Sequence, residues 1–193
     1  GNTTFDYEEE EKRRMMSVNL AIGSYTWKNN PCCVVDVPGY MDFVGEQISA
    51  AEAVDCAVIT VAVDSGVEVG TEQVYSLLLR KKTPFAIFLN KCDLDVDFGK
   101  IEESLREWLG KKPVFFTIPQ KGGGDTMRIV NLFDADPSDP VFGPHVGRLL
   151  DSIAEVDDAL MEKYLEGQPL SREEKVSAFR RGIADGSLVP VLC

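Results

Sequence analysis

The sequence predicts an α/β fold: a parallel β-sheet flanked by helices, with an α+β insertion in the chain. Two continuous apolar runs, residues 56–63 and 84–89, are typical of strands that are buried on both faces. Between them, residues 71–80 predict a helix with Thr71 as its N-cap. A strand, a helix and a second strand in this order imply a parallel β-α-β crossover.

Two strands and a helix are expected ahead of this crossover. Residues 17–27 are rich in β-forming side chains, and residues 32–35 form a short apolar run. The Lys-Asn-Asn-Pro sequence at 28–31 is a turn signal, so the two strands are expected to pair as a hairpin. Residues 45–54 then carry apolar side chains at helical spacing.

The pattern changes after Asp93. An apolar stripe predicts a helix over 98–109, and short strands are expected at 114–118 and 127–133. Further apolar residues at helical spacing predict one long amphipathic helix over 146–164.

The C-terminal part combines a capping box with an apolar strand. Ser171 and Glu174 have the capping-box spacing that opens a helix, and Gly186 suits the end of that helix. Residues 188–193 are typical of a buried strand. These patterns divide the chain into a core, an α+β insertion and a returning core strand, at residues 1–93, 94–186 and 187–193.

Composition limits the classes of partner. The net charge of −12 and the pI near 4.5 argue against direct DNA binding and against docking on an anionic membrane. The longest apolar run is too short to span a bilayer. The five cysteines include no Cys-x-x-Cys pair, and there is one histidine. A structural zinc site or a disulfide framework is therefore disfavoured, and a cytoplasmic location is expected.

The first candidate site follows the strand predicted at 32–35. Residues 36–39 read Asp-Val-Pro-Gly. Ligands of open α/β sheets sit at the carboxyl ends of strands. There the Asp36 carboxylate can hold Mg²⁺ directly or through water, and the backbone of Gly39 can approach a terminal phosphate. An ordinary strand-ending turn fits the same tetrad equally well.

The second candidate site, Asn-Lys-Cys-Asp at 90–93, follows the strand predicted at 84–89. The Asp93 carboxylate can accept hydrogen bonds from the N1–H and the exocyclic amine of guanine, a pair that adenine lacks. Asn90 can support the pocket and the carbonyl of the base, and the stem of Lys91 can lie over the base plane. A polar loop is the alternative for this tetrad alone. The two tetrads together, separated by one strand–helix unit, favour a nucleotide site.

With these motifs the chain resembles the guanine-nucleotide domain of translational GTPases, which have a P-loop GTPase core, and most closely that of elongation factor G. The likeness also includes Gly66, Glu68 and Thr71 between the two tetrads. Residues 157–166 and 189–193 are similar to that factor's insertion subdomain and to the strand that returns from it. Residues 6–13 and Tyr40 look more like the bacterial elongation factor G-like paralogues.

The resemblance implies a role for each matching residue. GTP or GDP with Mg²⁺ would be bound, and the ribosome would be the partner. Ser17 stands where the family has a threonine whose hydroxyl coordinates Mg²⁺, and Asp36 would lie near the same ion. Gly39 would contact the γ-phosphate. The guanine-binding positions would be Asn90, Lys91 and Asp93.

The chain departs from the family at three points. Tyr40 replaces the histidine that positions the attacking water. A tyrosine, with a pKa of about 10, stays neutral, although its hydroxyl can orient a water. Met15 stands where the family usually has glycine, so the local backbone is expected to differ. No Gly-x-x-x-x-Gly-Lys-Ser/Thr motif occurs, so the loop that cradles the phosphates is missing.

These departures leave the function open between related alternatives. We expect a piece of an elongation factor G-like GTPase, with hydrolysis that is slow, differently triggered or absent because of Tyr40. The piece alone is expected to be inactive and to gain little thermal protection from GDP. The alternatives are a ribosome-binding module that needs no nucleotide, and a ribosomal protection factor of the tetracycline-resistance type.

Overall fold

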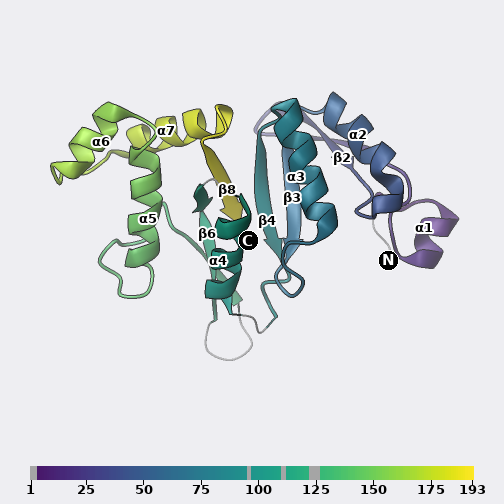
Figure 1. Cartoon of the computed structure of the whole chain (residues 1–193), viewed down its shortest axis with the longest axis horizontal. Coiled ribbons are helices and arrows are strands. Elements are labelled where there is room, and N and C mark those ends of the chain that lie inside the picture. The colour runs from purple at the N-terminus through teal and green to yellow at the C-terminus, as the bar shows by residue number, and fades with distance from the viewer. Residues whose placement is uncertain (1–3, 95–96, 110–111, 122–126) are drawn as a thin grey trace. The chain divides into compact units, whose positions relative to one another are not determined.

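The structure is a computed structural model that describes residues 4–94, 97–109, 112–121 and 127–193 (Figure 1). The chain forms two compact units, residues 1–57 with 69–83 and residues 58–68 with 84–193. The second unit contains a parallel four-stranded sheet with helices, which confirms the predicted α/β class. The predicted division into a core and an insertion at residue 93 stays a prediction.

The first unit combines a β-hairpin with short helices. Its elements are α1 (Glu9–Arg14), β1 (Ala21–Trp27), β2 (Asn30–Asp36), the 3-10 helix η1 (Met41–Phe43), α2 (Val44–Ala53) and α3 (Val69–Lys81).

The hairpin of β1 and β2 is antiparallel, as predicted, and its turn is tighter than expected. Trp27 pairs with Asn30, so only Lys28 and Asn29 connect the strands. Both connecting residues have positive φ angles, 48° and 64°, which is the backbone of a two-residue hairpin turn. Asn30 is therefore a strand residue and not a turn residue.

Helix α3 begins at Val69, before the predicted start. The turn that leaves β3 ends at Gly66, whose φ of 69° is readily adopted only by glycine. Because the chain is helical from Val69 onward, Thr71 lies inside the first turn. The assignment of Thr71 as N-cap is therefore wrong.

The second unit is built on four strands in the order β3-β4-β8-β5. Their bounds are Ala57–Ala62, Phe85–Asn90, Leu188–Leu192 and Lys112–Phe115. Strand β8 pairs in parallel with β4 on one side and with β5 on the other. Ile87 and Val191 face each other in this register, and both are fully buried. The buried strand predicted at the end of the sequence is confirmed.

Strand β3 is covered on one face only. Ile59 and Val61 are buried, whereas Val58 is 65% exposed and Thr60 is also exposed. The continuous apolar run predicted burial on both faces, and that prediction is wrong for β3. Alternate side chains of a strand point to opposite faces, and only the face of Ile59 and Val61 lies against the core.

The rest of the second unit consists of four helices and a second hairpin. The helices are α4 (Phe98–Leu109), α5 (Gly143–Ala154), α6 (Asp158–Leu165) and α7 (Arg172–Ala184), and the hairpin strands are β6 (Thr117–Lys121) and β7 (Met127–Asn131). Helix α5 contacts α6, α7 and β5, while α4 also packs on β5 (Figure 1).

The strand predicted at 114–118 is two strands, β5 and β6, that meet at Phe116. The N–H of Phe116 donates to the Val191 carbonyl at 2.8 Å, and its carbonyl accepts from the Leu132 N–H at 3.0 Å. The ring of Phe116 packs on those of Phe133 and Phe179. Phe116 therefore links the parallel sheet to the hairpin. Residues 122–126, between β6 and β7, lie outside the described residues.

The single long helix predicted over 146–164 is also two helices, α5 and α6. The Asp157 side chain accepts from the N–H groups of Ala159 and Leu160, at 2.9 and 3.2 Å, and so caps α6. Arg181 holds the same carboxylate at 2.6 Å. The apolar spacing continues across the break between α5 and α6, so the sequence pattern alone predicts one helix.

Helix α7 has the predicted capping box. The Ser171 hydroxyl accepts from the Glu174 N–H at 3.2 Å, and the Glu174 carboxylate accepts from the Ser171 N–H at 2.7 Å. Gly186, with a φ of 74°, follows the helix end. Within the described ranges, no helix is both long and apolar enough to cross a bilayer.

Helix α1 ends at Met15 in the backbone conformation that glycine prefers. Met15 has φ 55° and ψ 42°, and its N–H donates to the Glu11 carbonyl. Met15 thus adopts the left-handed conformation itself, and the expected difference from the family's backbone stays a prediction. For a non-glycine residue this conformation costs about 1–2 kcal/mol. The Met15 side chain is 77% exposed, so little packing offsets that cost.

Replacing Met15 with glycine is expected to stabilise the protein. The Met15→Gly variant removes the cost of the left-handed conformation. Glycine also makes the unfolded chain more flexible, which offsets part of this gain. The free energy of unfolding should therefore rise by about 0.5–1 kcal/mol. Urea denaturation measures this change. The control Met16→Gly lies at a residue without positive φ and should destabilise instead. A Met15→Gly variant that is less stable than the parent would contradict the backbone argument.

Candidate functional site

A buried carboxylate organises the loop between α1 and β1. Glu11 is 1% exposed, and it accepts hydrogen bonds from the N–H groups of Val18 at 3.0 Å, Asn19 at 3.2 Å and Glu8 at 3.1 Å. These backbone donors lower the pKa of the Glu11 carboxyl, those of Val18 and Asn19 most. The charged form of Glu11 therefore fixes the segment that carries Ser17.

Ser17 is bonded to an aspartate from the start of the chain. Its hydroxyl donates to the Asp6 carboxylate at 2.8 Å. A hydroxyl that donates its proton in this way keeps its oxygen lone pairs available for a cation. Asp6 thus orients the side chain for which a magnesium role was expected.

Asp36 lies at the end of β2, close to the negative charges of Asp6 and Glu11. Burial raises the pKa of Asp36 most, and the charge of Asp6 and then that of Glu11 add to the rise. A hydrogen bond from the Val37 backbone opposes the rise, but burial and the two neighbouring carboxylates together disfavour the charged form of Asp36. A divalent cation placed here would reverse that effect.

The residues after Asp36 are held by α2. The buried Gln47 amide donates to the Pro38 carbonyl at 2.9 Å, which fixes the backbone beside Gly39. A side chain at Gly39 would meet no heavy atom within 4 Å, so its surroundings are open. Tyr40 precedes η1 and is 58% exposed. The structure thus leaves both Gly39 and Tyr40 accessible in the first unit.

The second tetrad forms a tight loop after β4, in the second unit. The Asn90 side-chain oxygen accepts from the Lys91 N–H at 2.9 Å. Lys91 has a φ of 61°, and its carbonyl accepts from the Leu94 N–H at 3.0 Å. The exposed carboxylate of Asp93 lies inside this turn. The loop is therefore shaped by its own hydrogen bonds and by a left-handed residue.

Lys91 is paired with an aspartate from the end of β3. Its ammonium group lies 3.0 and 3.3 Å from the two carboxylate oxygens of Asp64. This contact lowers the pKa of the Asp64 carboxyl. The ion pair joins the loops that follow two adjacent strands, and it directs the lysine stem.

Sequence reasoning missed Asp6, Glu11 and Asp64. Asp64 had a usable signal, because it directly follows the apolar run at 56–63 just as the tetrads follow their strands. Asp6 and Glu11 lie in an acidic stretch without a periodic pattern, where neither of them stands out. Their importance appears only once the loop after α1 folds back onto them.

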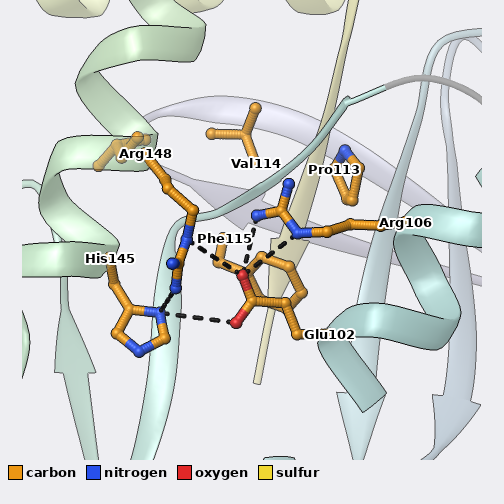
Figure 2. Close-up of a pocket in the computed structure, with 8 residues that line it drawn as sticks. Glu102, Arg106, Pro113, Val114, Phe115, His145 and Arg148 are labelled. Atoms are coloured by element: carbon orange, nitrogen blue, oxygen red, sulfur yellow. Dashed lines mark hydrogen bonds and ion pairs between the residues drawn. The ribbon is translucent and has the colours of Figure 1, made fainter. Parts of the chain in front are cut away.

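A further polar cluster surrounds Glu102 of α4, which is 8% exposed. Arg106 lies 2.8 Å from its carboxylate, Arg148 of α5 lies 3.3 Å away, and His145 of α5 lies 3.7 Å away (Figure 2). Arg148 also contacts the His145 Nδ1 at 2.9 Å. His145, the single histidine of the sequence, thus joins α5 to α4. Since Glu102 is shared by three basic groups, the cluster acts as an ion-pair link between two helices.

His145 should make stability depend on pH. Burial lowers its pKa, as do the charges of Arg148 and Arg106, and together they outweigh the opposing effect of Glu102. The unfolded chain then binds the proton more readily than the folded protein does. Stability should therefore fall as the pH drops through the unfolded pKa of about 6.5 toward the lower folded value.

Urea denaturation at pH 7.5, 6.5 and 5.5 measures this dependence. His145→Gln removes the only histidine of the sequence and should flatten the slope of unfolding free energy against pH in this window. Equal slopes in the parent and in the variant would contradict the assignment.

The donors in the first unit fit a magnesium ion chemically. A hydroxyl and a carboxylate are the hard oxygen ligands that Mg²⁺ prefers. No group of three or more His, Cys, Asp or Glu side chains arranged to hold a metal occurs among the described residues. Mg²⁺ usually binds through one or two protein ligands and keeps water or phosphate oxygens as the others, so the Ser17 hydroxyl and the Asp36 carboxylate are chemically compatible with it.

A parallel sheet with polar loops at its strand ends, one of them an Asn-Lys-Cys-Asp loop, defines a nucleotide-binding α/β domain of the GTPase class. The family model of the elongation factor Tu GTP binding domain matches residues 1–191. The chain belongs to this family, and membership implies that it binds a guanine nucleotide.

A solved structure supports the same assignment. The crystal structure of ttk003000868 from Thermus thermophilus matches with a TM-score of 0.89 and 30% sequence identity. The match covers 100% of this chain and 32% of the Thermus chain. The chain thus spans about a third of the length of that relative.

Proposed function

We propose that this chain belongs to an elongation factor G-like GTPase that binds GTP with Mg²⁺ and hydrolyses it on the ribosome. The observation that carries the proposal is the Asn90–Asp93 loop at the end of β4, with Lys91 anchored to Asp64. Asp93 and Asn90 would contact the guanine edge, and the directed stem of Lys91 would cover the base plane.

The first unit would serve the metal and the terminal phosphate. When bound, Mg²⁺ would neutralise the charge that develops on the phosphate oxygens. Ser17, oriented by Asp6, and the partly buried Asp36 are the side chains suited to hold it. The open backbone at Gly39 would contact the γ-phosphate. The raised pKa of Asp36 supports this assignment, because neighbouring negative charges favour a cation at that place.

The guanine assignment can be tested at Asp93. In the protein expressed from its complete open reading frame, Asp93→Asn should weaken GDP binding about 10- to 150-fold, since a hydrogen bond to a charged group is worth ~1.5–3 kcal/mol. The variant should also bind xanthosine diphosphate more tightly relative to GDP. Xanthine carries a carbonyl in place of the guanine amine, and the asparagine amide can donate to it. Isothermal titration measures both affinities. Asp55→Asn, at another exposed aspartate, is the control. Equal GDP affinity in both variants would exclude Asp93 from base recognition.

Tyr40 sets the expected rate of hydrolysis. Its hydroxyl can orient a water but cannot exchange protons as an imidazole does at neutral pH. Tyr40→His should therefore raise the single-turnover GTPase rate roughly tenfold or more, with little change in GDP affinity. Tyr40→Phe tests whether the hydroxyl itself contributes, and a small decrease is expected. A Tyr40→His rate equal to that of the parent would show that this position does not limit hydrolysis.

Tyr40 also supports a second candidate, a ribosome-binding module in which hydrolysis has been lost. The anchored Asn90–Asp93 loop weighs against it, since a protein without nucleotide has no need for a carboxylate placed to read guanine. A ribosomal protection factor would share the same domain and differ elsewhere in the protein. Ribosome pelleting with GDP, with a non-hydrolysable GTP analogue and without nucleotide distinguishes the first two, because only the module binds equally in all three.

A further inference from the structure

Two cysteines from distant parts of the sequence meet beside the Asn90–Asp93 loop. Strands β4 and β8 are parallel neighbours, with Phe88 paired to Leu192. Cys193 follows β8 directly, and Cys92 lies in the loop that follows β4. The pairing of the two strands therefore brings these thiols to the same end of the sheet.

Each thiol is aimed by contacts from its own strand end. The Cys92 thiol donates to the Leu89 carbonyl at 3.3 Å, which turns it back toward β4. The Cys193 sulfur lies 3.4 Å from the Thr117 hydroxyl, and that hydroxyl also accepts from the Cys193 N–H at 2.8 Å. Each thiol also affects the pKa of the other, as side chains that lie close together do. The other cysteines lie in the first unit, where Cys32 and Cys33 are adjacent on β2 and Cys56 is exposed.

We propose that Cys92 and Cys193 form a reversible disulfide that acts as a redox switch on the guanine-recognition loop. The bridge itself depends only on the geometry of the second unit. Its effect on nucleotide binding rests on the function proposed above.

A peroxide can supply the oxidising equivalents for this bridge. One cysteine thiolate attacks a peroxide oxygen, the O–O bond breaks, and a sulfenic acid and water form. The second thiolate attacks the sulfenic sulfur, the S–O bond breaks, and a second water leaves after protonation. Two thiols and one hydrogen peroxide thus give one disulfide and two waters.

The bridge would deform the loop because it brings two thiols that now contact other groups, the Leu89 carbonyl and the Thr117 hydroxyl, into covalent contact. An S–S bond measures about 2.05 Å. Closing that gap draws Cys92 toward β8, and Lys91 and Asp93 are its direct neighbours. Lys91 already has a left-handed backbone and is anchored to Asp64, so the loop has little freedom to absorb the shift. Displacement of Asp93 from the guanine edge should lower guanine affinity.

The chemistry of the thiols predicts a slow switch. Burial raises the pKa of Cys92 to about 11, and the neighbouring Cys193 adds to the rise. Burial also raises the pKa of Cys193. Since the thiolate is the reacting form, oxidation should accelerate steadily from pH 7 to pH 9. The switch would therefore respond to sustained rather than brief oxidation.

Peptide mapping under non-reducing conditions tests the bridge directly. The protein from its complete open reading frame is treated with hydrogen peroxide, its remaining thiols are blocked, and its peptides are analysed by mass spectrometry. We expect a Cys92–Cys193 cross-linked peptide that dithiothreitol removes. Cys92→Ser and Cys193→Ser should each abolish it, and Cys56→Ser should leave it unchanged. If Cys92 and Cys193 are both recovered blocked or singly oxidised after the treatment, the proposal is wrong.

GDP affinity tests the switch separately. Oxidation should weaken GDP binding at least about tenfold, dithiothreitol should restore it, and Cys193→Ser should be insensitive to oxidation. A bridge that forms without changing GDP affinity would overturn the switch. If the reduced protein does not bind GDP, the proposed function fails, while the mapping result still decides whether the bridge exists.

Discussion

The parallel pairing of β4 with β8 is the contact on which the second unit depends. It joins strands about a hundred residues apart and buries Ile87 against Val191 at the centre of the sheet. It also places β8 between β4 and β5, so that β5 joins the sheet through β8, and α4 and α5 pack on β5. The pairing also fixes β4, the strand from which the loop at 90–93 leaves the sheet.

In both units, polar loops are shaped by carboxylates that accept hydrogen bonds from backbone N–H groups or from a side chain. Glu11 holds the segment with Ser17, and Asp64 holds Lys91. These two contacts prepare the loops without any ligand, which reduces the ordering cost of binding. Asp36 has the opposite character, because burial and the charges of Asp6 and Glu11 disfavour its charged form, and a cation would favour it. Each unit thus carries its own feature of a ligand site: an acidic region at Asp36 in the first unit and a pre-shaped loop at Lys91 in the second.

Much of the fold could be predicted from the sequence because its signals are local. The hairpin, most of the helices and the capping box at Ser171 follow from spacing and turn chemistry. The predictions failed where tertiary contacts, and not local spacing, determine the structure. The break at Asp157 interrupts an apolar stripe that continues on both sides, and the exposed face of β3 depends on what packs against it. The tetrads could be found because each follows a strand. Asp64, the partner of Lys91, also follows an apolar run and could have been found in the same way, whereas Asp6, the partner of Ser17, becomes visible only in the folded chain.

Guanine selectivity is the central claim, and the ratio of two dissociation constants measures it most directly. The protein expressed from its complete open reading frame would be titrated with GDP and with ADP, each with Mg²⁺, under reducing conditions. Our account predicts a preference for GDP of about a hundredfold or more, since Asp93 would make two hydrogen bonds that adenine cannot offer. Equal affinities, or no binding of either nucleotide, would contradict it.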